Sequence, residues 1–247
     1  FDEGIILKAA KTKIPIDGLS PNTTYYYTPR INKVNVFAAN YPQFQTAPVE
    51  GREHEFTFTV LTDFGYAKIQ DSPKAFLSAS LENPSFTIIG GDFDHRDPGR
   101  KQLDLNKIRQ NTRIMYRENL SHNVIRRKDL ANFVLRKTGI VHLWDDHDFA
   151  KNNSDGNYVG KKVGLEVYDE YFTSYPRPSP DSGIFQSWTW GHVQFFLLDG
   201  RYNRNPSRDP DTAEKTMLGD IQKSWLKEGL QASTATWKII LSGPVFN

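Results

Sequence analysis

The stretch Trp144-Asp145-Asp146-His147-Asp148, followed by Asn152-Asn153, governs how the rest of the chain is interpreted. It comes directly after Gly139–Leu143, a short apolar run typical of a buried strand. Three carboxylates and one imidazole therefore occupy four consecutive positions at the end of a strand. Such close like charges repel one another, and a multivalent cation offsets the repulsion. The stretch predicts a metal site, although an acidic surface loop would have the same composition.

Aspartates also follow three other predicted strands. The strands expected over residues 56–61, 86–89 and 192–198 are followed by Asp63, Asp92 and Asp199. In open α/β sheets the carboxyl ends of the strands meet along one edge, where ligands bind. We therefore expect all four acidic positions to lie in register across one sheet. Because Asp is also a common turn residue, each position alone would indicate only a turn.

Carboxylate oxygens with a few imidazoles suit hard or borderline cations, namely Ca, Mg, Mn, Fe or Zn. Two such ions about 3.5–4 Å apart would share a bridging carboxylate and clamp a phosphoryl oxygen. They would also lower the pKa of a bound water from about 15.7 towards 7.

Composition narrows the class of protein. The 247 residues carry a net charge of +2, which is too balanced to indicate binding to nucleic acid or to an anionic membrane. The chain has no cysteine, which excludes disulfides and thiolate metal sites and suits an exported protein. No apolar run approaches the roughly 18 residues of a membrane span, and we expect no signal peptide within these residues. We expect a secreted, periplasmic or cell-surface location.

Residues 1–50 have a β-type pattern. Residues 18–25 follow the pattern Gly-Leu-x-Pro-x-Thr-x-Tyr, which resembles the strand-turn-strand corner of fibronectin-type domains. Residues 24–30 and 34–37 are strand-like in content. These features predict a partial β-sandwich over residues 1–50, with residues 41–48 as a linker. The alternative is a β-extension of the main domain.

From residue 51 onwards strands alternate with helices, which predicts an α/β domain over 51–247. Ser72-Pro73 has the form of a helix start. Further helices are expected over residues 103–120, 128–137 and 164–173, and a fourth from the apolar spacing of Leu218, Ile221, Trp225 and Leu226. Residues 186–190 and 192–198 predict a hairpin around Gly191, and residues 237–242 a last strand.

Four motifs taken together resemble the PhoD-type alkaline phosphatases, which belong to the calcineurin-like metallophosphoesterases. The motifs are Gly91-Asp92, the acidic stretch with Asn152-Asn153, Leu-Asp-Gly-Arg-Tyr over 198–202 and Leu-Gly-x-x-Gln-x-x-Trp-Leu over 218–226. They keep the family's order from about Leu19 to the end. The resemblance implies a four-layer αββα core behind a partial all-β domain of fibronectin or Ig type. It also implies a two-metal site, with Ca and Fe favoured and Mn or Zn as alternatives.

The resemblance also implies roles for the acidic residues. Asp92 would bridge the two metals, and Asp63 would bind the first of them. Asp146 would take the second-metal position that is Asn in the wider superfamily. Asp145 would be a ligand or would support one.

His147 would approach the substrate phosphate, where it would stabilise charge or protonate the leaving alkoxide. Asp148 would orient His147 or the metal ligands. Asn153 and Arg201 are candidate substrate contacts. A role in shaping the loop is the alternative for Asn153, and a salt bridge that supports the loop explains Arg201 at least as well.

The chain departs from the family pattern at three places. Asp63 follows Thr62 where the family often has Ser-Cys, which replaces a soft thiolate by a hard carboxylate. His95 stands where the family tends to have a metal-binding Tyr, which shifts the metal preference away from ferric iron. The superfamily's closing Gly-x-His motif does not occur before Asn247, so we expect the domain to be incomplete at its C-terminal end.

The function expected from these features is hydrolysis of a small phosphate ester by a metal-bound hydroxide. No Ser, Cys or Thr nucleophile is set beside a base, so no covalent phospho-enzyme is expected. Nucleic acid would enter only as a diester substrate, and the oligomeric state stays open. The rivals are a non-catalytic calcium-binding scaffold or adhesion protein and a metal-dependent hydrolase of another bond.

Overall fold

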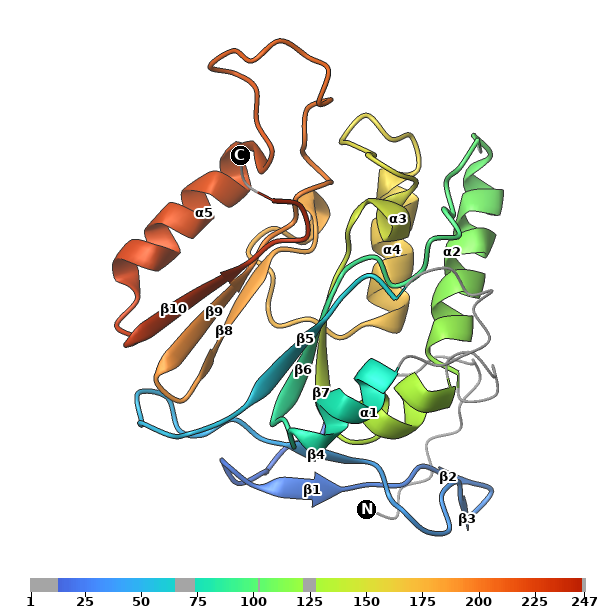
Figure 1. Ribbon diagram of the computed structural model, residues 1–247, viewed down its shortest axis with the longest axis vertical. Helices are drawn as coiled ribbons and strands as arrows, with labels where there is room; N and C mark the ends of the chain where they lie inside the picture. The colour runs from blue at the N-terminus through green and yellow to red at the C-terminus, as the bar shows by residue number, and fades with distance from the viewer. Residues whose placement is uncertain (1–12, 65–73, 102, 122–127, 246–247) are drawn as a thin grey trace.

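Two three-stranded sheets form the centre of the computed structural model, which describes residues 13–64, 74–101, 103–121 and 128–245 (Figure 1). The first sheet is parallel, in the order β5-β6-β7, and consists of Phe58–Leu61, Phe86–Gly90 and Gly139–Leu143. The second has the order β10-β9-β8, where Gln186–Trp190 (β8) and Val193–Leu197 (β9) form the predicted hairpin. Trp237–Leu241 (β10) lies parallel to β9.

The two sheets pack against each other through aromatic side chains. The ring of Phe195 on β9 lies 5.2 Å from that of Phe58 on β5 and 5.4 Å from that of Phe86 on β6. The next residue on β9, Phe196, points to the other face and contacts Trp225 at 5.8 Å. The second sheet therefore lies between the first sheet and α5 (Gly219–Ala232), as Figure 1 shows, with its edge strand β10 partly exposed.

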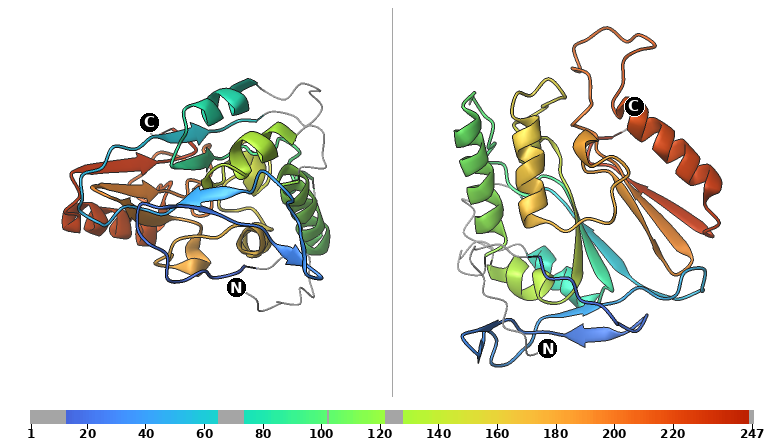
Figure 2. Two further views of the ribbon diagram at one scale, coloured as in Figure 1. Left: turned by 90° about the horizontal axis from the view of Figure 1, so that it is seen from below. Right: turned by 180° about the vertical axis from the view of Figure 1, so that it is seen from behind.

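Helices cover the first sheet. The predicted helix over 128–137 is a π-helix, η2 (Leu130–Leu135), and it packs with α1 (Lys74–Leu81). The predicted helices over 103–120 and 164–173 are α2 (Leu105–Asn119) and α4 (Lys161–Tyr171), which stand side by side in both views of Figure 2 and contact each other. The predicted helix start at Ser72-Pro73 lies outside the described residues. None of the helices within the described ranges is both long enough and apolar enough to cross a membrane.

The expected linker over residues 41–48 is wrong, because Gln43–Gln45 forms strand β4. It pairs antiparallel with β1 (Thr24–Tyr26), while β2 (Arg30–Ile31) pairs with β3 (Val34–Asn35). The backbone N–H of Gln43 donates to the carbonyl of Arg136, 3.0 Å away, so β4 is attached to the segment before β7. The alternation of Gln43-Phe44-Gln45 is a strand signal that the Pro-rich flanks obscured.

His142 on β7 is buried in an aromatic cluster. Its ring stacks on Phe172 at 3.8 Å, and Tyr168 and Tyr116 lie at 5.5 and 5.9 Å. Among the described residues neither ring nitrogen has a hydrogen-bond partner. Burial without a partner disfavours the charged imidazole and lowers the pKa of His142 to about 3.

We expect His142 to make the protein less stable as pH falls from about 6.5 towards 3. In this window the unfolded chain binds a proton at His142 and the folded chain does not, which favours unfolding by up to about 5 kcal/mol. The free energy of unfolding, measured with urea at pH values from 7.5 to 4 for the wild type and for His142→Phe, gives the contribution of His142. The variant should lose less stability on acidification than the wild type. If stability falls with pH in parallel for the two proteins, His142 is not the cause of the loss.

Candidate metal centre

The acidic stretch begins where β7 ends and folds into a short helix, α3 (Asp146–Phe149). The carboxylate of Asp148 stabilises this turn by accepting from the backbone N–H of Asp145 at 3.1 Å and of Phe93 at 2.8 Å. Phe93 lies on the loop after β6, so Asp148 ties the ends of two neighbouring strands together. The same contacts occupy both carboxylate oxygens of Asp148, which therefore has a structural role in placing the site.

Gly91 lets the loop after β6 approach the end of β7. Its φ is +98°, and a Cβ there would lie 2.8 Å from both the backbone N and the Cβ of Asp145. Only glycine tolerates this conformation at this distance. Asp92 follows with φ of +50° and is directed towards α3, where its Oδ1 accepts from the N–H of His147 at 3.3 Å.

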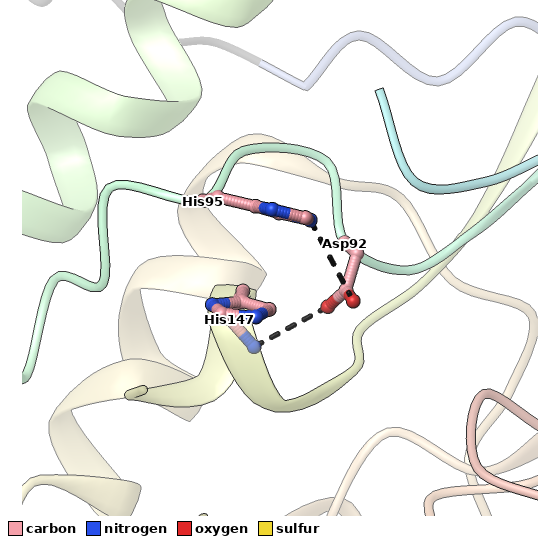
Figure 3. A group of neighbouring side chains, drawn as sticks. All are labelled: Asp92, His95 and His147. Atoms are coloured by element: carbon pink, nitrogen blue, oxygen red, sulfur yellow. Dashed lines mark hydrogen bonds and ion pairs between the residues drawn. The ribbon is translucent and has the colours of Figure 1, made fainter. Parts of the chain in front are cut away.

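Two groups of potential metal ligands share Asp92. The first is Asp92 with His95 and His147, whose rings stack with centroids 4.2 Å apart (Figure 3). The second is Asp92 with Asp145 and Asp146. In each group the ligand atoms lie within 4.8 Å of one another. One carboxylate common to two ligand groups would let two neighbouring ions share a ligand.

The surroundings of Nε2 of His95 are those of a metal ligand. This nitrogen lies 2.9 Å from Oδ1 of Asp63 and 3.8 Å from Oδ2 of Asp92. The atom is buried, yet none of these contacts has the geometry of a hydrogen bond. A buried nitrogen directed at two carboxylates without a hydrogen bond is the environment that a cation would complete. Asp63 itself is largely exposed and lies outside both ligand groups.

The carboxylates repel one another. Burial raises the pKa of Asp92 to about 6, with further contributions from the negative charges of Asp146 and Asp145. Burial also raises the pKa of Asp145 and of Asp148, against the opposing effect of Arg201 on Asp145. A cluster in which protonation is favoured in this way is one in which a metal ion can replace the proton.

Arg201 neutralises part of this charge from the second sheet. Its Nε lies 2.5 Å from Oδ1 of Asp145, and its Nη2 lies 3.6 Å from Oδ2 of Asp146. Gly243, after β10, also approaches this point, since a Cβ there would lie 2.8 Å from Cγ of Asp145. The guanidinium is thus engaged by carboxylates, in agreement with the salt-bridge explanation.

Asp199 does not join the other three aspartates in one sheet, so that expectation is wrong. It follows β9 in the second sheet, where its buried carboxylate accepts from the backbone N–H of Ile184, Arg201 and Tyr202 at 2.9–3.0 Å. These bonds fix the turn that presents Arg201. Hydrophobic pattern identifies a strand but not the sheet that it joins.

The imidazole of His147 is hydrogen-bonded to Asp97, which the sequence did not indicate. Oδ1 of Asp97 lies 2.5 Å from Nδ1 of His147. Burial lowers the pKa of His147, but the bond to Asp97 and the negative charges of Asp92 and Asp146 outweigh this, so the pKa is raised. Asp97 thus occupies the orienting position that was expected for Asp148. Its place in a non-repetitive loop gave no motif by which to find it.

Asn153 contacts the site through its backbone. Its N–H donates to Oδ2 of Asp146 at 2.5 Å, and its φ is +58°. A cavity of about 580 Å³ opens beside the two stacked histidines, and Asp97 and Asn152 also line it. The loop that contains Asn152 and Asn153 therefore borders the candidate site.

Comparison with known proteins identifies the family. A solved structure described as PhoD superposes with a TM-score of 0.66 at 21% identity, covering 91% of this chain and 48% of that one. Alkaline phosphatase D of Bacillus subtilis (strain 168) is 22% identical over an alignment 266 positions long, which covers 94% of this chain and 44% of that protein. An acid phosphatase of Aspergillus ficuum is 34% identical over 86 residues, 34% of this chain and 14% of that protein.

This chain therefore spans less than half the length of the relatives that it matches. The model of the PhoD-like phosphatase family matches residues 74–247, which is well over half of the chain. These residues include the two ligand groups and the loop that carries Asp97. The chain belongs to the PhoD-like phosphatase family.

Proposed function

We propose that the protein hydrolyses phosphate esters at a two-metal site formed where β6 and β7 end. The observation that carries the proposal is that Asp92 belongs to both ligand groups. Membership of a phosphatase family supports the same reaction class. We further propose that residues 51–247 belong to a four-layer helix-sheet-sheet-helix domain and that residues 1–50 are part of a β-sandwich. We also propose that the protein is exported, because a chain without cysteine suits an exported protein.

The residues present fit the metals. Asp92 would be shared, Asp145 and Asp146 would complete one side, and His95 with Asp63 would complete the other. The donor set favours hard or borderline ions, so Ca and Fe are proposed, with Mn or Zn as alternatives. Bound metal ions would supply a nucleophile derived from water at neutral pH and positive charge against the phosphoryl oxygens.

The chain's own residues hold protons and orient the groups around them. Asp97 accepts from Nδ1 of His147, which leaves Nε2 to carry a proton for the leaving alkoxide. The raised pKa of His147 keeps that proton available towards neutral pH. Arg201 holds Asp145 in place and Asp148 holds the loop of Phe93, while the side chain of Asn153 is proposed to contact the substrate from the rim.

Metal removal and restoration test the proposal. In the full-length protein stripped of metal, Ca, Mn, Fe and Zn are added back singly and in pairs. p-Nitrophenyl phosphate, bis-p-nitrophenyl phosphate and p-nitrophenyl acetate are the substrates. Metal-restored turnover of a phosphate ester supports the proposal, and the preferred ester decides between monoesterase and diesterase. Metal binding without turnover would favour the calcium-binding scaffold, and turnover of the acetate alone would favour a hydrolase of another bond.

A further inference from the structure

A basic surface adjoins the candidate metal centre, and the reaction proposed above does not use it. Arg100, Lys101 and Lys151, here called the basic wall, line the same cavity as His95 and His147. A second cavity of about 720 Å³ shares Lys101 and Lys151 with the first and extends past them to Arg208. Basic side chains therefore continue away from the histidine pair across two adjoining cavities.

The two lysines of the basic wall form no ion pair with any described residue, although Asp155 also lines the second cavity. Within the described part of the chain, no carboxylate lies at ion-pair distance from the ammonium of Lys101 or Lys151, and Arg100 lies 3.8 Å from Asp97. Two arginines elsewhere on the surface are paired, Arg109 with Glu166 and Arg113 with Glu170. Unpaired cations that line a cavity create a positive potential that attracts anions.

The loops that carry the basic wall are fixed to each other. The N–H of Gly99 donates to the carbonyl of Ala150 at 3.1 Å, which joins the turn before Arg100 to the start of the Lys151 loop. The N–H of Arg100 donates to the carbonyl of Asp97 at 2.9 Å, and the N–H of Lys151 donates to Oγ of Ser154 at 2.9 Å. The loop that carries Asp97, the partner of the His147 ring, thus also carries Arg100 and Lys101, and it is joined to the loop of Lys151.

We infer that the basic wall binds a second anionic group on the alcohol portion of the substrate. The wall lines the same cavity as His147, which places it on the side of the leaving group. The substrate class is then a phosphate ester whose alcohol carries a further phosphate or carboxylate. This inference rests on the proposed phosphate-ester hydrolysis.

Matched alkyl esters test the inference in the metal-restored, full-length protein. n-Butyl phosphate has an uncharged alcohol, whereas 1,4-butanediol bisphosphate and 4-phosphooxybutanoate carry a second phosphate or a carboxylate. Release of phosphate is measured for the wild type, for the double variant Lys101→Gln/Lys151→Gln and for the control Lys227→Gln, an exposed position on α5 outside both cavities.

The double variant is expected to raise KM about tenfold for the doubly anionic esters and to leave n-butyl phosphate and kcat unchanged. The control should match the wild type. In the wild type, added NaCl should raise KM for the doubly anionic esters more than for n-butyl phosphate, because salt screens exposed charges. A response of both charged esters indicates general recognition of an anion, and a response of the bisphosphate alone indicates a second phosphate.

Equal KM for all three esters, unaffected by the double variant or by salt, would overturn the inference and leave the hydrolysis proposal standing. No turnover of any phosphate ester with any metal would overturn both. The salt series on the wild type also separates failure of the inference from failure of the hydrolysis proposal, and it does not depend on whether a variant folds.

Discussion

Replacement of Asp92 by Asn is expected to lower metal-restored hydrolysis of p-nitrophenyl phosphate by about a thousandfold or more. The amide has nearly the shape of the carboxylate but no charge. Since Asp92 is shared by both ligand groups, the change weakens both at once, whereas loss of Asp145 or His95 would affect one. Metal content per chain, measured by mass spectrometry after dialysis, should fall together with activity.

The metal-free forms provide the control for folding. Asp92 is half-buried beside Asp145 and Asp146, which raises its pKa, so the neutral Asn relieves repulsion. Metal-free Asp92→Asn should therefore be at least as resistant to urea at pH 7.5 as the metal-free wild type. Asp220→Asn on α5, an exposed carboxylate, is the matched control and should leave activity and metal content unchanged. Full activity with full metal content in Asp92→Asn would rule out the shared-ligand proposal.

Replacement of Asp97 by Asn is expected to lower kcat for alkyl phosphates about ten- to a hundredfold. The carboxylate at 2.5 Å orients His147 and raises its pKa, so an amide would leave a less basic and less constrained imidazole. The effect should be small for p-nitrophenyl phosphate, because p-nitrophenolate leaves without being protonated. The pKa of the basic limb in the pH profile of kcat should shift downwards.

The leaving-group comparison separates this role from a general structural defect. A variant that merely disturbs the loop would slow both classes of ester alike. If Asp97→Asn slows p-nitrophenyl phosphate as much as n-butyl phosphate, or if the pH profile does not move, His147 is not the proton donor that Asp97 supports. Asp220→Asn again serves as the control.

Much of the site could be predicted from local sequence. Asp92, Asp145, Asp146 and His147 each lie at the end of a strand whose apolar pattern is plain, and parallel strands bring such ends together. Asp97 could not be predicted, because its contact with His147 depends on the path of an irregular loop. Turn contacts of this kind leave no periodic signal in the sequence.

The fold, like the site, has features that local sequence predicts and features that it does not. The strands and most helices follow hydrophobic periodicity, which depends on neighbouring residues. The assignment of Asp199 to the wrong sheet and of residues 41–48 to a linker both concern which distant segments pair. Such pairing depends on packing between strands that are far apart in the chain, for example Phe195 against Phe58.

The ion pair between Arg201 and Asp145 has a consequence for recombination between relatives. Asp145 follows β7 in the first sheet and Arg201 follows β9 in the second, and Gly243 must also leave room for the same carboxylate. A chimaera with a crossover between residues 171 and 186 would join halves whose partners have diverged. Such chimaeras should fold only when the C-terminal part brings an arginine and a glycine that match the aspartate of the N-terminal part. Asp145, Arg201 and Gly243 therefore have to be exchanged together.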